Sequence, residues 1–340
     1  FGDTATNTVS LLIGEGDNNY IVDWGDGTTP TPNTATHAYT AQDTYTITVS
    51  GRIPDGIKFG KSYSNGGSLT YSGEKRLTAF ITPLLQQSST DVSLLFESCL
   101  NLTEISSDLF VRNPQLTYFW RAFADCTSLI EIPGGLLDSC TEATNFLSLF
   151  LGCTSLEEIP SDLFANNTEV TTFQGAFAYC SSLEAISPSL FNTNTEVTSF
   201  DWMFNSCTSL TEIPLNLFAN NTKATGFQGT FYSCTSLTEI PFNLFANNTK
   251  VTDFYCTFWG CLGLTSIPSN LFDNNKLVTN FYHTFYNCKG INTALPNWWD
   301  PAIYPQADFP QFHLTGDAMK IFTGCTGASN YGTAQTEGWG

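Results

Sequence analysis

Residues 153–180 read CTSLEEIPSDLFANNTEVTTFQGAFAYC, and this stretch decides the fold because the chain repeats it. Its first and last residues, Cys153 and Cys180, are 27 residues apart, and further cysteines continue the series at the same interval in both directions. The series is Cys99, Cys126, Cys153, Cys180, Cys207, Cys234, Cys261 and Cys288. A fixed period of this length is the signature of a protein built from stacked repeats.

Apolar residues recur in phase with these ladder cysteines. Phe stands three residues before each of them, Leu three after and Ile six after in most units, as at Phe150, Leu156 and Ile159. A unit of this size with about seven apolar positions cannot close a core alone, but stacked units bury each side chain against its equivalent. We therefore expect a solenoid whose coils lie roughly 4.8 Å apart.

Local signals predict the path of each coil. Pro160 and the Asn-rich segment 166–168 indicate turns. The T-x-I-P and V-T-x-F segments indicate two short strands that pair in parallel with neighbouring coils. The F-x-x-C segment suits a helical or 3-10 turn. The predicted fold class is mainly β with short helical or 3-10 turns, in a solenoid of eight 27-residue coils with end caps.

The pattern C-x-x-L-x-x-I-P…L-F…V-T-x-F…F-x-x-C resembles the BspA-like leucine-rich repeats of bacterial and phage surface proteins, over roughly residues 94–295. The resemblance implies a leucine-rich repeat solenoid and a location that is extracellular, on a bacterial cell surface or on a virion surface.

The first 51 residues lack the repeat. Segments 7–13, 20–24 and 44–49 alternate like strands, so we expect a small β-sandwich. The motifs W-G-D-G, H-A-Y and Y-T-I-T-V, which begin at Trp24, His37 and Tyr45, resemble a polycystic-kidney-disease (PKD) type, immunoglobulin-like domain. The resemblance implies a turn Asp that caps backbone amides and a Tyr that packs beneath the sheet.

Two alternatives concern this N-terminal unit. Asp23 and Asp26 suit calcium, although two carboxylates are few for an ion that takes six to eight oxygens. His37 is expected to hydrogen-bond within the core and not to catalyse a reaction. Apart from calcium, which is an alternative here and at the acidic stripe described below, the sequence predicts no cofactor and no metal site.

We predict four segments: a PKD-like sandwich over 1–51, a linker and N-terminal cap over 52–93, the solenoid over 94–295 and a C-terminal cap over 296–340. Trp298 and Trp299 are expected to cover the final coil, with sugar binding by an exposed pair as the alternative. Phe322 and Cys325 match the F-x-x-C segment of the repeat. The linker carries a basic cluster, interpreted as a solvated face or inter-domain contact, at Arg52, Lys58, Lys61, Lys75 and Arg76.

The cysteines are expected to be buried, reduced thiols, because parallel equivalents point the same way and nine ladder positions, with Cys325, cannot all pair. No C-x-x-C spacing supports zinc. Cys140 and Cys256 lie off the ladder, Cys140 in the place of a turn Asn, and both are interpreted as free surface thiols.

Composition excludes several function classes. The chain of 340 residues has 12 Lys and Arg against 31 Asp and Glu, a net charge of −19. Such a charge opposes binding to nucleic acid and to anionic lipid. No apolar run is long enough for direct membrane insertion, and the first residues do not read as a signal peptide. Only three histidines occur, and no catalytic motif stands in a fitting context, so we expect no enzyme.

An acidic stripe occupies one repeat position between Leu and Ile. It consists of Glu104, Glu131, Glu158, Glu212 and Glu239. Like charges about 5 Å apart repel by on the order of 1 kcal/mol even in water. We interpret the stripe as a solvated face, with a cationic ligand or bridging calcium as the alternative.

A second face varies while the framework repeats. Its positions between the repeated Phe residues carry aromatic, Arg and Asp side chains that suit recognition of a protein or glycan, although drift on an ordinary surface and packing between coils remain alternatives. The candidate ligand-binding residues are Trp120, Arg121, Asp201, Trp202, Tyr232, Tyr255, Trp259, Tyr282, His283 and Tyr286.

Three functions follow as hypotheses. The leading one is a surface-exposed adhesin or receptor-binding module whose partner is a host protein or glycan. The second is a structural subunit or spacer of a bacterial surface appendage or phage virion, which contacts itself or neighbouring subunits. The third is an accessory module of an enzyme.

Overall fold

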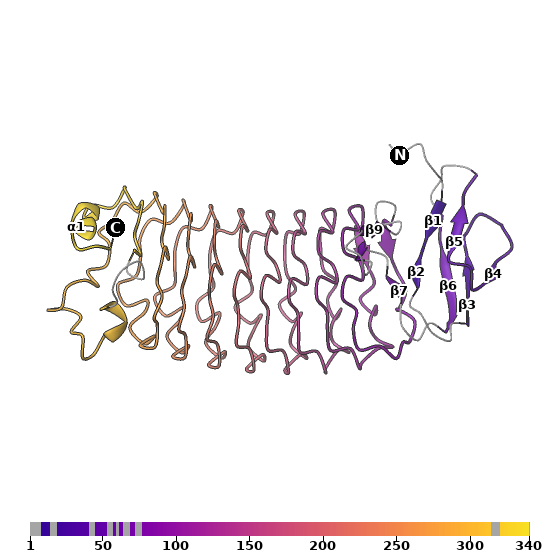
Figure 1. Ribbon diagram of the computed structural model, residues 1–340, viewed down its shortest axis with the longest axis horizontal. Coiled ribbons are helices and arrows are strands. Elements are labelled where there is room, and N and C mark those ends of the chain that lie inside the picture. The colour runs from indigo at the N-terminus through magenta and orange to yellow at the C-terminus, as the bar shows by residue number, and fades with distance from the viewer. Residues whose placement is uncertain are drawn as a thin grey trace.

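The computed structural model describes residues 8–13, 19–40, 45–52, 57–58, 61–63, 69–71, 77–313 and 320–339. Figure 1 shows an elongated molecule: short strands lie at one end, a long stack of coils follows, and helix α1 (Tyr331–Thr336) lies at the other end. The coils form a repeat solenoid with strand-like and turn segments, and α1 is the α-helix among the described residues.

The N-terminal strands pair antiparallel. Strand β3 (Asn19–Asp23) lies between β4 (Thr31–Pro32) and β6 (Thr48–Arg52). Three two-stranded sheets join β1 (Thr8–Ser10) to β5 (Thr36–Ala38), β2 (Leu12–Ile13) to β7 (Ile57–Lys58), and β8 (Lys61–Tyr63) to β9 (Leu69–Tyr71). The expected strands near 7–13 and 20–24 are present, and the third begins only at Thr48.

The basic cluster falls largely outside this description. Lys75 and Arg76 lie outside the described residues, and Arg52, Lys58 and Lys61 belong to strands of which only the backbone is described. The interpretation of this cluster therefore stays a prediction.

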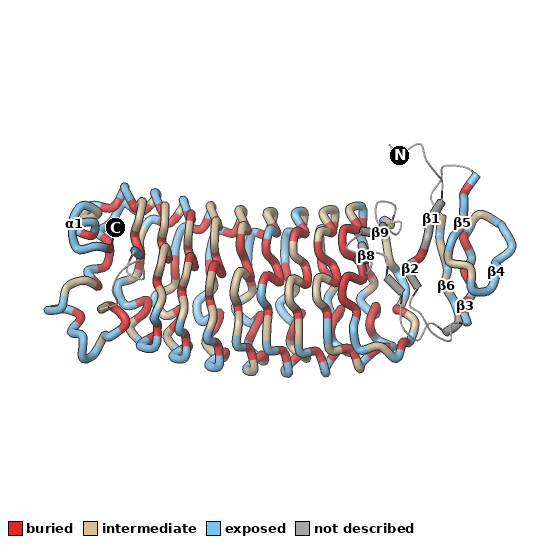
Figure 2. The backbone as a smooth tube through the Cα atoms, in the orientation of Figure 1, coloured by how far each residue is buried: buried red, intermediate tan, exposed pale blue. Residues whose placement is uncertain are grey.

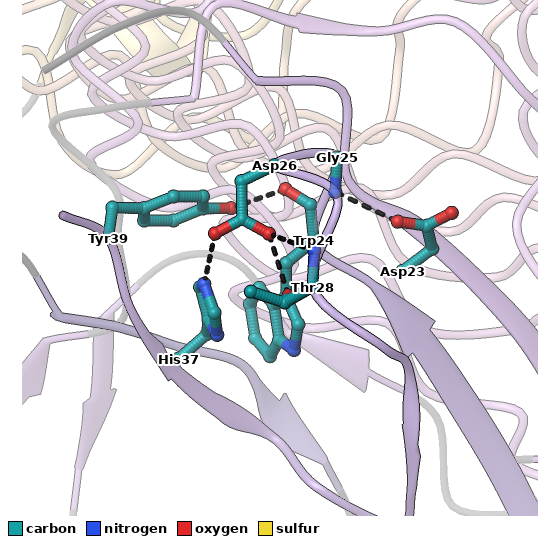
Figure 3. A network of polar contacts seen from close by, with 7 residues as sticks. All are labelled: Asp23, Trp24, Gly25, Asp26, Thr28, His37 and Tyr39. Atoms are coloured by element: carbon teal, nitrogen blue, oxygen red, sulfur yellow. Dashed lines mark hydrogen bonds and ion pairs between the residues drawn. The ribbon is translucent and has the colours of Figure 1, made fainter. Parts of the chain in front are cut away.

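Polar contacts hold the turn after β3 (Figure 3). Asp23 accepts the N–H of Gly25 at 2.9 Å, and Asp26 accepts the N–H and hydroxyl of Thr28 at 3.1 and 2.7 Å. The other oxygen of Asp26 lies 2.7 Å from Nε2 of His37. Both carboxylates therefore serve the fold of the turn, as expected for structural residues.

Aromatic packing supports the same turn from below. The hydroxyl of the buried Tyr39 donates to the carbonyl of Trp24 at 2.9 Å, and the Trp24 and His37 rings stack with centroids 5.2 Å apart. Tyr39 also stacks on Tyr45 at 4.3 Å. His37 is thus held between a carboxylate and an indole, which agrees with a hydrogen-bonding role in the core.

Backbone hydrogen bonds join each coil to the next in parallel. Single-residue bridges link one position per coil at intervals of 27 residues: Asp91, Tyr118, Asn145, Thr172, Ser199, Gly226, Asp253 and Asn280. Thr171, in the V-T-x-F segment, donates to the carbonyl of Thr144 at 3.0 Å. The predicted ladder at V-T-x-F is therefore present, although it is one residue wide.

The T-x-I-P segment forms a regular strand pair only at the start of the stack, where β10 (Ala79–Phe80) pairs in parallel with β11 (Glu104–Ile105). The residue after Ile contributes to this difference. Ser106 donates its N–H to the carbonyl of Phe80 at 2.7 Å and extends the ladder. Most later coils carry Pro at this position, as at Pro133, and proline has no N–H to donate.

The F-x-x-C segment is neither a regular helix nor a strand among the described coils. Alternate N–H groups point along the solenoid or back into their own coil: Phe123 donates to Leu149 of the next coil at 2.9 Å, whereas Ala124 donates to Arg121 at 3.2 Å. The expected tight turns are therefore present, as a series of three-residue turns combined with bonds between coils.

Three columns of Phe fill the solenoid core, and Figure 2 shows buried positions recurring along the stack of coils. In the column three residues before the ladder cysteines, ring centroids of neighbouring coils lie 5.0 to 6.0 Å apart, from Phe96 to Phe322. Complete burial of one such side chain stabilises the fold by about 1.5–3 kcal/mol.

All eleven cysteines are free and buried. In the ladder, each thiol from Cys126 onward donates to the carbonyl of the Phe in the preceding coil, as Cys180 does to Phe150 at 3.3 Å. Burial raises the pKa of these thiols, so they stay protonated and able to donate. The prediction of buried, reduced ladder thiols is confirmed.

The prediction that Cys140 and Cys256 are surface thiols is wrong. Cys140 is fully buried in a column where other coils carry a buried Asn. Cys256 is only 4% exposed. Burial raises the pKa of Cys140 to about 12 and that of Cys256 to about 11.

A column of buried Asn side chains bonds the coils together on the inside. Asn194, for example, donates through Nδ2 to the carbonyls of Phe164 at 3.0 Å and Asn167 at 2.9 Å in the preceding coil. The column, interrupted by Cys140, consists of Asn113, Asn167, Asn194, Asn221, Asn248 and Asn275. The second residue of the expected Asn turn is therefore an interior hydrogen-bond donor.

The C-terminal segment closes the stack. Phe322 stacks on Phe285 at 6.0 Å, and Cys325 donates to the carbonyl of Phe285 at 3.0 Å, so segment 320–325 forms one more rung. Trp298 is fully buried, donates through Nε1 to the carbonyl of Ser269 at 2.7 Å and stacks on Phe312. The 3-10 helix η1 (Pro310–Phe312) and α1 complete this end.

The alternative that an exposed Trp298–Trp299 pair binds sugar is wrong. Trp298 is buried, and Trp299 packs edge-on against Trp339 with centroids 6.1 Å apart. Both rings cover the last coils, as the leading interpretation of this segment expected.

Thiol titration tests the buried cysteine ladder. We expect a large thiol reagent such as DTNB to modify less than one thiol per native chain and all eleven in guanidinium chloride, because burial blocks both access and ionisation. A Ser161→Cys variant, whose side chain stands at an exposed position, should add one fast-reacting thiol. Rapid reaction of several native thiols would contradict the structure.

Acid titration tests the turn after β3. Bonds from the Thr28 side chain, and then from His37, lower the pKa of Asp26 from 3.8 to about 2. A lowered pKa in the folded state stabilises the fold above pH 3.8, and the gain disappears as the pH falls toward about 2. We expect Asp26→Asn to lower the urea concentration at the midpoint of unfolding at pH 6, followed by the NMR signal of the Trp24 indole N–H. Near pH 2 the substitution should have little effect. An equal effect at both pH values would contradict this.

Candidate ligand-binding face

All ten candidate residues are half-buried and lie on the segments that precede the ladder cysteines. Seven of them form one connected group of rings over consecutive coils, which we call the aromatic ladder: Trp202, Tyr232, Tyr255, Trp259, Tyr282, His283 and Tyr286. Asp201 lies next to its first ring. Residues far apart in the sequence thus meet on one face of the C-terminal half of the solenoid.

The middle of the aromatic ladder is a stack of parallel rings. Trp259 lies 4.3 Å from Tyr232 and 5.4 Å from Tyr286, with interplanar angles of 1° and 3°. His283 contacts both Tyr282, at 3.7 Å, and Tyr286, at 4.5 Å. Each stacked pair contributes about 0.5–1.5 kcal/mol beyond its burial. The stack both stiffens this face and presents ring edges to solvent.

The backbone under this face is left-handed at a fixed repeat position. Five residues before each ladder cysteine, φ is positive in every coil: Leu94, Arg121, Ser148, Gly175, Trp202, Gly229, Cys256 and His283. Residues directly before the cysteines share this conformation, as at Tyr179 (φ 64°). Because the conformation recurs in every coil, it belongs to the fold and gives no evidence of function.

Two glycines make room for the first residues of the face. A Cβ on Gly226 would lie 2.6 Å from Oδ1 of Asp201, and a Cβ on Gly229 would collide with the ring of Trp202. The side chains of Asp201 and Trp202 therefore lie against the backbone of the next coil, in space that a side chain at position 226 or 229 would fill.

A polar chain runs beside Trp202. Asp201 accepts the N–H of Gln228 at 2.8 Å, and the Gln228 amide donates to Asp253 at 2.9 Å. Asn280 donates to the same Asp253 oxygen at 3.3 Å. Burial raises the pKa of Asp201 above its ordinary value. These side chains are thus fixed in orientation by one another and by the backbone.

Trp120 and Arg121 lie apart from the aromatic ladder. They precede Cys126, three coils before Trp202, a separation of about 14 Å at the usual strand spacing. Arg121 donates to the buried Glu97 at 2.6 Å and to Asp125 at 2.9 Å, so its guanidinium already neutralises an interior carboxylate.

The acidic stripe is exposed at all five positions. Among the described residues, no group of three or more His, Cys, Asp or Glu side chains is placed to hold a metal ion. In the same part of the chain, no helix has the length and apolar character needed to cross a membrane.

Comparison with known proteins finds leucine-rich repeat folds at low similarity. No family model and no curated protein matches the chain. The leucine-rich repeat domain of APL1 aligns with 60% of this chain and 44% of its own, at 15% identity and a TM-score of 0.38. A leucine-rich repeat protein from Bacteroides ovatus aligns with 78% of this chain and 83% of its own, at 17% identity and a TM-score of 0.31.

The Toll–Spatzle complex of Drosophila aligns with 71% of this chain and 34% of the matched chain, at 16% identity and a TM-score of 0.33. The chain thus spans less than half the length of the APL1 and Toll chains. TM-scores this low assign no family, so the description as a repeat solenoid comes from the hydrogen bonds between its own coils.

Gln228, which occupies a variable position of this face, and Asp253 are not among the candidate residues taken from the sequence. A signal was present: the bulky pair Asp201-Trp202 is followed one coil later by Gly226, where other coils carry larger residues, and by Gly229, where all but the coil of Gly175 do. Glycines one period after a bulky pair indicate that the pair lies across the neighbouring coil.

Truncation of the central ring tests the stiffening role of the aromatic ladder. We expect Trp259→Ala to lower the free energy of unfolding by about 1–3 kcal/mol, because two stacked pairs are lost. Urea denaturation followed by circular dichroism measures this. Tyr118→Ala, which truncates an exposed aromatic ring at another position of the repeat, is the matched control with a small expected effect. Equal effects of the two substitutions would contradict the stacking.

Proposed function

We propose that this chain is a non-enzymatic, surface-exposed binding protein, an adhesin or receptor-binding module, that recognises a protein or glycan through the aromatic ladder. The observation that carries the proposal is the gathering of seven Trp, Tyr and His rings on one face of a scaffold whose framework positions repeat. Rigid aromatic side chains supply large contact areas at a low cost in conformational entropy.

The N-terminal unit supports a surface location. We propose that it is a PKD-like domain, because Asp26 caps the turn, Tyr39 packs beneath Trp24 and the strands pair antiparallel. Together with the resemblance of the coils to BspA-like repeats, this favours a bacterial cell-surface or virion protein. The segment boundaries at 51, 93 and 295 belong to the same proposal.

A structural subunit or spacer is the second candidate. Leu215 and Phe242 share one repeat position in neighbouring coils and are 53% and 59% exposed. A neighbouring subunit that covers this apolar pair would remove it from water, with a gain of about 25 cal/mol per Å² of apolar surface.

Binding of the purified chain to arrays of glycans and host proteins tests the first candidate, with and without calcium. We expect a specific partner whose signal falls at least tenfold in the triple variant Trp202→Ala, Tyr255→Ala, Tyr282→Ala. The matched control, Glu104→Gln, Glu131→Gln, Glu158→Gln, alters the acidic stripe and should keep the signal. Oligomers in light scattering without any array partner would favour the structural subunit.

A further inference from the structure

Trp202 lies face-down on the next coil. A Cβ built on Gly229 would stand 2.3, 2.4 and 2.7 Å from Cε3, Cζ3 and Cδ2 of Trp202. Three such similar distances to consecutive ring atoms place that Cβ under the face of the six-membered ring and not at its edge. The ring normal therefore follows the direction in which a side chain would leave residue 229. The second face of the indole points away from the solenoid.

This ring differs from the others in the aromatic ladder. Both faces of Trp259 are covered by Tyr232 and Tyr286, so that residue offers only its edges. Tyr232 meets Trp202 at 51° and does not cover it. The preceding coil carries Gly175 at the position of Trp202, so no side chain reaches toward the outer face from there. Trp202 is half-buried, and no ring stacks in parallel on its outer face, which we call the platform.

Hydrogen-bonding groups stand at the rim of this platform. Asp201 precedes Trp202 in the chain, and its carboxylate contacts the N–H of Gln228, whose amide is held by Asp253. These planar groups keep lone pairs beyond the bonds they already make, since a carboxylate accepts about four. An aromatic face bordered by fixed acceptors and an amide matches a ligand that is apolar on one face and carries hydroxyls around its rim.

We propose that Trp202, Asp201 and Gln228 form a carbohydrate subsite that binds one pyranose ring. The C–H groups on one face of the sugar carry partial positive charge and stack on the negative face of the indole, while its hydroxyls donate to Asp201 and exchange hydrogen bonds with Gln228. This inference rests on the proposed role of the face in binding, and it selects glycan over protein as the partner.

The geometry fits a sugar better than a cation. A cation bound by aromatic residues prefers a position within about 6 Å of ring centroids, and a second ring must leave room for it. The centroids of Trp202 and Tyr232 are only 5.7 Å apart and their planes meet at 51°, so these two rings do not form a cage around an ammonium group. One oxygen of Asp201 is also engaged by the backbone of Gln228.

Affinity electrophoresis of the full chain tests the subsite. Native gels contain one soluble polysaccharide each, from a panel of β-glucan, xylan, galactomannan and mucin glycans. We expect at least one of them to retard the chain. Trp202→Ala should weaken that binding at least tenfold, Trp202→Phe should retain much of it, and Tyr179→Ala, which removes an exposed ring 51% accessible to solvent, should leave it unchanged.

Circular dichroism establishes that each variant is folded. Gly229→Ala supplies an independent variant, because its Cβ displaces the Trp202 ring from the backbone of residue 229 while Trp202 itself is kept. The free monosaccharide of the retarding polymer should restore mobility, and choline should not. Absence of retardation throughout the panel, retardation that survives Trp202→Ala, or competition by choline would each overturn the subsite. Array binding to a protein that depends on the aromatic ladder would then leave the proposed function standing without its glycan partner.

Discussion

The hydrogen bonds between successive coils are the constraint on which the rest of the molecule depends. Backbone N–H groups reach carbonyls 26 residues onward, as from Phe123 to Leu149, or 27 residues back, as from Thr171 to Thr144. Side-chain donors follow the same register, because Asn194 and Cys180 reach carbonyls of the preceding coil. A coil one residue longer would leave buried polar groups unpaired and would turn the Phe columns out of the core.

This register explains why the framework repeats while one face varies. Cys at the ladder position is small enough to be buried, and its thiol donates to the carbonyl of a Phe in the preceding coil, as Cys180 does to Phe150. The side chains of the variable face contact their neighbours from outside the backbone ladder. Their residue types differ from coil to coil while the left-handed backbone positions beneath them recur, and glycines at 226 and 229 allow Asp201 and Trp202 to lie flat.

Periodicity alone predicted the solenoid, the parallel ladder at V-T-x-F, the burial of the ladder cysteines and the covering role of Trp298. Other features depend on burial and on hydrogen bonds between coils, which the repeat pattern does not show. The sequence predicts Cys140 to be a surface thiol because Asn is a common turn residue, whereas the structure places that column in the interior. The strand at T-x-I-P is confined to the first coils, and Pro133 and most of its equivalents have no N–H with which to extend it.

The candidate face was predictable as a set of varying positions but not as a site. Sequence alone did not show that Trp259 is covered on both faces, because that depends on how Tyr232 and Tyr286 stack. Nor did it show that Trp202 lies flat, which depends on Gly229 one coil away. Nor did it show that Arg121 is bound to Glu97 and lies apart from the aromatic ladder. Burial and ion pairing decide which of these side chains a ligand can reach.

A pair of deletions tests the register most directly. Removal of residues 127–153, one period of 27, brings Cys126 next to Thr154 and restores every bond between coils. We expect this variant to keep the circular dichroism per residue and a cooperative thermal transition. Removal of 128–153, one residue fewer, puts the two halves out of register and should lower the transition temperature sharply. Equal transition temperatures for the two deletions would contradict the account.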